Sequence, residues 1–177
     1  MSRRAAFIDR DGTINVQPPE HSYVTRAEDL EILPGALEGM RALADCGFAL
    51  VIASNQRGVG RGLLSMDDLN AIDAEIRSRL AEQGAELAGS YYCPHLIDDD
   101  CDCRKPKPGL LTRAASELDL DLPGSWMIGD SASDVEAGTA AGCRTVFLGG
   151  DPPAEATLIA PTLAEAAELV CAAPEPG

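Results

Sequence analysis

The amino-acid sequence predicts an α/β fold in which a central parallel sheet is covered by helices on both faces. Short apolar runs alternate with segments of helical periodicity, and the run at 48–53 is almost continuously apolar, as in a strand buried on both faces. Several of these runs end at polar or acidic residues. Ligands of parallel sheets bind beyond the carboxyl ends of the strands, so we expect those polar residues to converge on one site.

Length and composition fit one globular domain. With 177 residues, of which 45% are apolar and 24% charged, residues 1–177 are expected to form a single domain with its own core. No apolar run approaches the roughly 20 residues that span a bilayer, and the basic N-terminus lacks the apolar region of a signal peptide. The formal net charge of −15 argues against binding to nucleic acids or anionic membranes. We expect a cytoplasmic monomer.

The predicted strands are short apolar runs, each bounded by residues that favour turns or by a change of periodicity. They are expected at 5–8, 48–53, 90–92, 126–128, 144–148 and 158–160. The last is expected to pair at an edge of the sheet. Strands at these spacings, separated by helical segments, favour parallel crossover connections.

The predicted helices carry apolar residues three or four positions apart, and several begin at a recognisable cap. Ser65 with Asp68 and Thr162 with Glu165 are typical helix starts. The helices are expected at 35–47, 65–80, 108–118, 135–141 and 162–170. Residues 14–31 and the glycine-rich stretch 57–62 are expected to be irregular, and the Pro-rich tail 172–177 is expected to be disordered.

Two acidic residues one position apart follow the first strand. Side chains of Asp9 and Asp11 leave an extended backbone on the same side, and Gly12 permits a sharp turn. Their carboxylates repel each other, and a divalent cation relieves that repulsion. Two alternatives are a solvated turn and a calcium loop, whose ligand spacings fall at Asp9, Asp11, Thr13, Asn15 and Glu20. A calcium loop needs glycine where this chain has Ile14, and a helix where it has a strand.

Further polar residues stand at the ends of the second and fourth strands and in the loop before 108. The set expected to converge is Asp9, Asp11, Ser54, Asn55, Arg104, Lys105, Asp130 and Asp134. These residue types suit phosphoryl transfer. One carboxylate can attack phosphorus, a second can protonate the leaving oxygen, and cations can neutralise the transferring group. Taken singly, Ser54-Asn55 could be a plain turn and Asp130 a plain strand end.

Positive charge gathers in the predicted site loops of an otherwise acidic chain. The only lysines in the sequence, Lys105 and Lys107, stand beside Arg104. Together with three further arginines they make six of the 14 cationic residues, the three being Arg10, Arg57 and Arg61. This distribution favours a small anionic ligand.

A second constellation combines three thiols and an imidazole within eleven residues. Cys93, His95, Cys101 and Cys103 make a complete tetrahedral set for a structural zinc ion. The alternative is a group of ordinary thiols. A non-enzymatic interpretation, a zinc-stabilised binding module, also fits this cluster. The other cysteines, Cys46, Cys143 and Cys171, are isolated and are expected to be buried thiols, which suits a reducing cytoplasm.

From about residue 5 to 150 the sequence resembles the haloacid dehalogenase-like phosphatases. The motifs that carry the resemblance are, in order, Asp9-Arg10-Asp11-Gly12-Thr13, Ser54, Lys105 and Gly129-Asp130 with Asp134. The resemblance implies a three-layer, Rossmann-like fold and a magnesium-dependent phosphomonoesterase. Asp9 would be the nucleophile and Asp11 the acid/base. Magnesium would bind the carboxylates of Asp9 and Asp130 and the backbone carbonyl of Asp11, while Ser54 and Lys105 would hold the phosphoryl group.

Within that family, the Cys-His-Cys-Cys loop leading into Arg-Lys-Pro is similar to two branches without a large cap domain. One branch acts on a heptose bisphosphate and the other on histidinol phosphate. We favour the sugar bisphosphate, although the five residues between His95 and Cys101 also suit the other branch. The resemblance implies substrate contacts from Glu20, Tyr23, Asn55, Gln56, Arg57 and Arg104. A second phosphate would need further cations, and the candidates are Arg57, Arg61, Arg104 and Lys107. An amine substrate would instead favour the acidic run 98–100.

Overall fold

The computed structural model, described here for residues 2–175, is built on a parallel sheet of six strands with the order β3-β2-β1-β4-β5-β6. The strands are β1 (Ala5–Ile8), β2 (Ala49–Asn55), β3 (Leu87–Cys93), β4 (Trp126–Gly129), β5 (Arg144–Leu148) and β6 (Leu158–Ala160). The strand order reverses between β1 and β4, which places the usual ligand site of such a sheet beyond the ends of these two strands. The predicted α/β class with a parallel sheet is confirmed.

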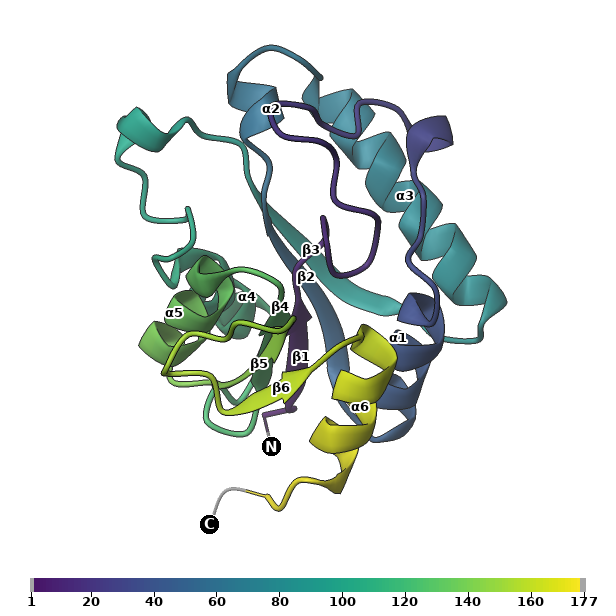
Figure 1. Cartoon of the computed structure of the whole chain (residues 1–177), viewed down its shortest axis with the longest axis vertical. Coiled ribbons are helices and arrows are strands. Elements are labelled where there is room, and N and C mark those ends of the chain that lie inside the picture. Colours follow the sequence, from purple (N-terminus) through teal and green to yellow (C-terminus); the bar gives the residue numbers. More distant parts are fainter. Residues whose placement is uncertain (1, 176–177) are drawn as a thin grey trace.

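Helices cover both faces of the sheet and complete three layers. They are α1 (Ala36–Asp45), α2 (Arg57–Gly60), α3 (Met66–Glu82), α4 (Gly109–Leu118), α5 (Ala132–Ala141) and α6 (Leu163–Ala172), with 3₁₀ turns η1 (Ala27–Asp29) and η2 (Ile97–Asp99). In Figure 1, α4 and α5 lie on one side of the sheet and α1 and α6 on the other. In the described part of the chain, no second sheet or large cap covers the strand ends.

The two layers of helices rest on two separate hydrophobic cores. Along β1, Ala6 and Ile8 belong to the core beneath α1, α3 and α6, whereas Ala5 and Phe7 belong to the core beneath α4. This alternation follows from the two-residue period of a strand, whose successive side chains point to opposite faces. Because both faces are covered, all four side chains are buried, which explains the uninterrupted apolar run in the sequence.

Most element boundaries match the sequence prediction, and the differences have local causes. The expected cap of α3 is present, since the Asp68 amide donates to the Ser65 hydroxyl and the Ser65 amide donates to the Asp68 carboxylate. Strand β3 begins three residues earlier than predicted, because this edge strand is only partly buried and lacks a continuous apolar pattern. The stretch 57–62 was expected to be irregular, but it begins with the one-turn helix α2, in which Gly58 packs against Tyr23.

The prediction of three isolated buried thiols is wrong for two of them. Cys46, at the end of α1, and Cys171, in α6, form a disulfide across a sequence separation of 125 residues. The pairing depends on the packing of α1 against α6, which the local sequence around each cysteine does not indicate. Cys143 is buried and free, as expected.

The C-terminal segment continues past α6 in contact with the domain. Helix α6 includes Ala172, and Arg144 donates from Nη1 to the carbonyl oxygen of Pro174. The expected disorder of the tail stays a prediction for residues 176 and 177, which lie outside the described residues. Within residues 2–175, no helix is both long and apolar enough to cross a bilayer.

Candidate active site

The ends of β1, β2 and β4 border a cavity of about 280 Å³. The sequence-predicted residues that line it are Asp9, Asp11, Tyr23, Ser54, Asn55, Arg57, Arg104, Lys105, Asp130 and Asp134. They come from five separate segments of the chain, which the parallel sheet brings to one edge. Five further lining residues were not singled out from the sequence, namely Gln17, Pro18, Ser22, Ser131 and Ser133. Ser131 and Ser133 lie just after the end of β4, and that position was the available signal.

Lys105 is a buried cation in the lining of the cavity. Its Nζ lies 2.9 Å from Oδ1 of Asp9 and 2.5 Å from Oδ1 of Asp134, and it also donates to the carbonyl oxygen of Ala53 at 2.7 Å. Burial alone would lower the pKa of Lys105, but the two carboxylates raise it above its usual value overall. The amine is therefore a fixed positive charge at the point where β1 and β2 end.

Three carboxylates crowd together beside this amine. Oxygens of Asp9, Asp130 and Asp134 lie within 4.8 Å of one another. Burial and the negative charge of Asp134 raise the pKa of Asp9 to about 7, although Lys105 acts in the opposite direction. Burial and Asp134 also raise the pKa of Asp130. Such crowding of hard oxygen ligands fits a divalent cation, which would favour the ionised forms.

The turn after β1 makes room for that carboxylate cluster. Gly12 has a φ of +83°, and a β-carbon at this position would collide with the carboxylate of Asp130. Thr13 donates from its hydroxyl to Oδ1 of Asp130 at 3.4 Å. Glycine is thus required both for the left-handed backbone and for the close approach of β1 and β4.

Asp11 is held away from the cluster by a set of donors. Arg10 donates from Nη2 to both carboxylate oxygens, at 3.0 and 3.3 Å, and Asn15 donates from Nδ2 to Oδ1 at 2.9 Å. Gln56 donates from Nε2 to Oδ2 at 2.9 Å. Arg10 is fully buried, so the prediction that it binds a small anionic ligand is wrong. Its charge is used to fix the Asp11 side chain.

Ser54 and Asn55 end β2 and have different surroundings. The Ser54 hydroxyl is buried and accepts a hydrogen bond from Nε2 of Gln56 at 3.1 Å. The Asn55 side chain makes two 3.0 Å bonds with the backbone of Lys105, accepting from its amide and donating to its carbonyl. Arg104 lines the cavity, and its Nη1 is buried without a partner among residues 2–175. Asn55 therefore couples the end of β2 to the loop that carries both cations.

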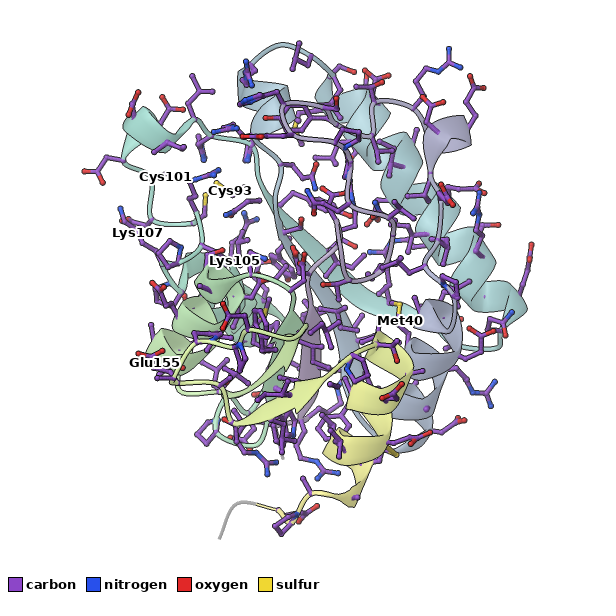
Figure 2. The ribbon with its side chains drawn as sticks, in the orientation of Figure 1. Met40, Cys93, Cys101, Lys105, Lys107 and Glu155 are labelled. Atoms are coloured by element: carbon purple, nitrogen blue, oxygen red, sulfur yellow. A yellow bond between two sulfur atoms is a disulfide. The ribbon has the colours of Figure 1, made fainter. Side chains whose placement is uncertain are left out.

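That loop begins at the cysteine-histidine cluster predicted from the sequence. The Cys93 Sγ lies 3.6 Å from both His95 Nδ1 and Cys101 Sγ, while Cys103 Sγ lies 3.2 Å from His95 Nδ1 and 3.6 Å from Cys101 Sγ. The edges of a tetrahedral zinc site with these ligand types are about 3.5–3.8 Å. Figure 2 shows Cys93 and Cys101 close together above Lys105. Donor types and spacing both fit one zinc ion.

The predicted substrate contacts divide into two groups. Tyr23 and Arg57 line the cavity, where Nε of Arg57 donates to the Tyr23 hydroxyl at 3.1 Å. Glu20 is exposed, lies outside the cavity lining and faces His21. Gln56 is buried and points to Asp11 and Ser54. The geometry thus separates Glu20 and Gln56 from the residues that reach open space in the cavity.

Comparisons with known proteins match this chain over nearly its full length. A family profile described as "HAD-hyrolase-like" matches residues 102–166, which include Lys105 and Asp130. A D-glycero-β-D-manno-heptose-1,7-bisphosphate 7-phosphatase of Pseudomonas aeruginosa is 38% identical over 178 residues, covering 96% of this chain and 99% of the relative. The protein of the same name from Escherichia coli K12 is 39% identical over 151 residues, covering 81% of this chain and 78% of the relative.

A solved structure agrees with the sequence relatives. The crystal structure of D,D-heptose 1,7-bisphosphate phosphatase from B. bronchiseptica, complexed with magnesium and phosphate, superposes with a TM-score of 0.86. The two sequences are 34% identical, and the match covers 94% of this chain and 97% of the other. The likeness therefore extends over almost the whole chain.

Proposed function

Because the chain belongs to the haloacid dehalogenase-like hydrolases, we propose that it is a phosphomonoesterase that removes the 7-phosphate from D-glycero-D-manno-heptose 1,7-bisphosphate. The observation that carries the proposal is the cavity in which Asp9, Asp11, Ser54, Lys105 and Asp130 converge. The substrate is supported by relatives of that name that match almost the whole chain. The residues of the cavity supply the chemistry for each step.

The reaction would proceed through an aspartyl-phosphate on Asp9. The Asp9 carboxylate attacks phosphorus as the bond to the sugar oxygen breaks, and Asp11 gives that oxygen its proton. Asp11 then takes a proton from water, which attacks the phosphorus of the acyl phosphate and releases phosphate and free Asp9. Lys105 favours the ionised form of Asp9 through its 2.9 Å ion pair. Asp11 is oriented for both proton transfers by its ring of donors.

The residues of the cavity also fit the magnesium ion that this family uses. The carboxylates of Asp9 and Asp130 and the backbone carbonyl of Asp11 would hold it, and when bound it would offset the negative charge of the transferring phosphoryl group. Asp134 has a different role, because Oδ1 pairs with Lys105 and Oδ2 accepts from the Ser131 backbone amide and hydroxyl. It keeps the lysine in place beside the metal ligands.

A structural zinc ion would fix the loop that precedes Lys105. All four tetrahedral positions would be filled by Cys93, His95, Cys101 and Cys103, so no position remains open for catalysis. Because Arg104 and Lys105 follow the last ligand directly, the ion would determine where these cations point. We infer that the zinc ion supports activity only by ordering the loop that carries Arg104 and Lys105.

Histidinol phosphate remains the alternative substrate, but two of the three acidic residues that would recognise its amine are used within the loop. Asp99 accepts from the Leu96 amide at 2.7 Å, and Asp100 pairs with Lys107 at 2.9 Å. These contacts support the sugar bisphosphate. We further propose that the chain acts as a single-domain monomer in the cytoplasm, where phosphorylated sugars are retained because their charge prevents passage through membranes.

The decisive test compares kcat/KM for the heptose 1,7-bisphosphate anomers, histidinol phosphate and an aryl phosphate, each with and without added magnesium. We expect the highest value for a heptose bisphosphate and loss of all turnover when magnesium is chelated. A preference for histidinol phosphate would overturn the substrate but leave the reaction class standing. No release of phosphate from any ester would favour the non-enzymatic alternative, a zinc-stabilised binding module.

A further inference from the structure

A second cavity adjoins the catalytic one on the side of α2. It has a volume of about 430 Å³ and is lined by His21, Arg57, Arg61, Leu96, Ile97 and Asp98. Arg57 also lines the catalytic cavity, so the two spaces share one guanidinium group. A ligand longer than a single phosphate could therefore extend from Lys105 into this second space.

Two arginines give the second cavity an excess of positive charge. Neither Arg57 nor Arg61 forms an ion pair within residues 2–175, although the chain has a net charge of −15. One carboxylate, Asp98, borders the same space. Several arginines elsewhere on the surface pair with acidic neighbours, as Arg113 does with Glu117 at 2.8 Å and Arg41 with Asp45 at 2.8 Å. The two unpaired guanidinium groups leave donors available for an anion.

Tyr23 holds Arg57, the arginine that lines both cavities. Its hydroxyl accepts from Nε of Arg57 at 3.1 Å. Partial burial would raise the pKa of Tyr23, but hydrogen bonding and positive charge from Arg57 and then Arg61 lower it below the usual value. The Arg57 guanidinium therefore lies at the phenol oxygen, on the boundary that the two cavities share. Because Arg57 uses Nε for this bond, its two terminal nitrogens make no hydrogen bond within residues 2–175 and can bind a phosphate with two parallel bonds.

The other cations considered for a second phosphate are less suitable. Lys107 forms an ion pair with Asp100 at 2.9 Å and also donates to the carbonyl oxygen of Cys101 at 2.9 Å. Arg104 lines the catalytic cavity next to Lys105, where the transferring phosphoryl group would lie. This leaves the pair near Tyr23 as the cations that lie beyond the reaction centre yet remain connected to it.

We propose that Arg57, held by Tyr23, and Arg61 form a subsite for the second phosphate of a bisphosphate substrate, the group that stays on the product. This inference rests on the proposed function and extends it by assigning the end of the substrate that does not react. The subsite takes a phosphate monoester dianion through charge-assisted bonds from two guanidinium groups. Its consequence is selectivity, because an ester with a single phosphate leaves both arginines without a ligand.

The test measures the ratio of kcat/KM for a bisphosphate to that for the matching monophosphate. Two pairs are used: heptose 1,7-bisphosphate with heptose 7-phosphate, and fructose 1,6-bisphosphate with fructose 6-phosphate. We expect wild-type ratios well above one for the heptose pair. Arg57→Met and Arg61→Met should each lower the ratio by about 10- to 100-fold, mainly through a higher KM for the bisphosphate, since each removes a charge-assisted contact.

Three further variants separate this role from a general loss of charge or fold. Tyr23→Phe keeps the ring but removes the acceptor for Arg57, and it should lower the ratio by a smaller factor than Arg57→Met. Arg113→Met removes one positive charge from an exposed ion pair on α4 and should leave the ratio unchanged. Arg57→Lys, which keeps the charge without the planar fork, should recover part of the ratio.

The possible outcomes separate a failure of the subsite proposal from a failure of the proposed substrate. Ratios near one for both wild-type pairs, or ratios that Arg57→Met and Arg61→Met leave unchanged, would overturn the subsite. Loss of the ratio in these variants for the fructose pair alone would keep the subsite and reject the heptose bisphosphate as substrate. An equal fall for bisphosphate and monophosphate would assign both arginines to the reaction centre and so also contradict the proposal.

Discussion

The side-chain amide of Gln56 joins Asp11 to Ser54, donating to the Asp11 carboxylate at 2.9 Å and to the Ser54 hydroxyl at 3.1 Å. Gln56 is buried and follows β2 directly. The proposed acid/base and the proposed phosphoryl ligand are therefore held by one group. A change in this amide should displace both at once.

Replacing Gln56 with leucine should lower kcat by about 10- to 100-fold while changing KM less than about threefold, because Asp11 loses orientation for proton transfer. The lost buried hydrogen bonds should also reduce the free energy of unfolding by about 1–2 kcal/mol. Steady-state kinetics and urea denaturation measure these two effects. Gln83→Leu, at the exposed end of α3, is the matched control. An unchanged kcat would show that Gln56 does not position Asp11.

Replacing Asp9 with asparagine should reduce turnover by at least about 10⁴-fold, since the amide cannot form the covalent intermediate. The side chain keeps its size and can still accept from Lys105, so circular dichroism should show an intact fold. Acid quenching of the wild-type reaction followed by mass spectrometry should show one phosphoryl group on the peptide that contains Asp9. Asp45→Asn, on the surface of α1, is the control, and substantial residual phosphate release from Asp9→Asn would exclude this mechanism.

The sequence predicts those site residues that stand at the ends of strands. Asp9, Ser54 and Asp130 each follow an apolar run, and a parallel sheet necessarily brings such ends to one edge. The destinations of individual side chains could not be predicted in the same way. Gln56 was placed toward the substrate and Arg10 toward an anion, yet both are directed to Asp11 by rotamers that depend on the packed structure.

Replacing Asn55 with alanine should lower kcat/KM by about tenfold, because the backbone of Lys105 loses both bonds that hold it to the end of β2. The loss is expected in binding of the phosphoryl group as well as in kcat, since Lys105 would move relative to Asp9. Asn70→Ala, in α3, tests the same substitution on an exposed surface. Equal kinetics for the two variants would show that the zinc loop positions Lys105 without Asn55.

Protein purified without added metal should contain one zinc ion per chain by elemental analysis. The double variant Cys101→Ser, Cys103→Ser should lose that zinc and most of its activity, because Arg104 and Lys105 would no longer be fixed. Cys143→Ser, which changes a free buried thiol outside the cluster, should keep the zinc. If the double variant retained full zinc occupancy, the assigned ligands would be wrong.

The Cys46–Cys171 disulfide was missed for a different reason, since it depends on contacts between segments far apart in the chain. Cys46 ends α1 and Cys171 lies in the last turn of α6, and the two helices pack closely against each other. Neither position has a sequence pattern that indicates its partner. In a reducing cytoplasm, the location proposed above, both thiols would be kept free, so we expect the bond to form once the protein is under oxidising conditions.

The disulfide should contribute strongly to stability in protein purified under oxidising conditions. It closes a loop across 125 residues, for which the chain-entropy model gives an upper value of about 5 kcal/mol. Reduction, or the double variant Cys46→Ser, Cys171→Ser, should therefore lower the free energy of unfolding while leaving kcat nearly unchanged, since the bond joins α1 to α6 on the face of the sheet away from the zinc loop. Thiol titration of the denatured, zinc-free chain should find the four cysteines that remain free. Finding six free thiols after oxidative purification, or equal unfolding with and without reductant, would contradict the bond and would restore the prediction of a fully reduced chain.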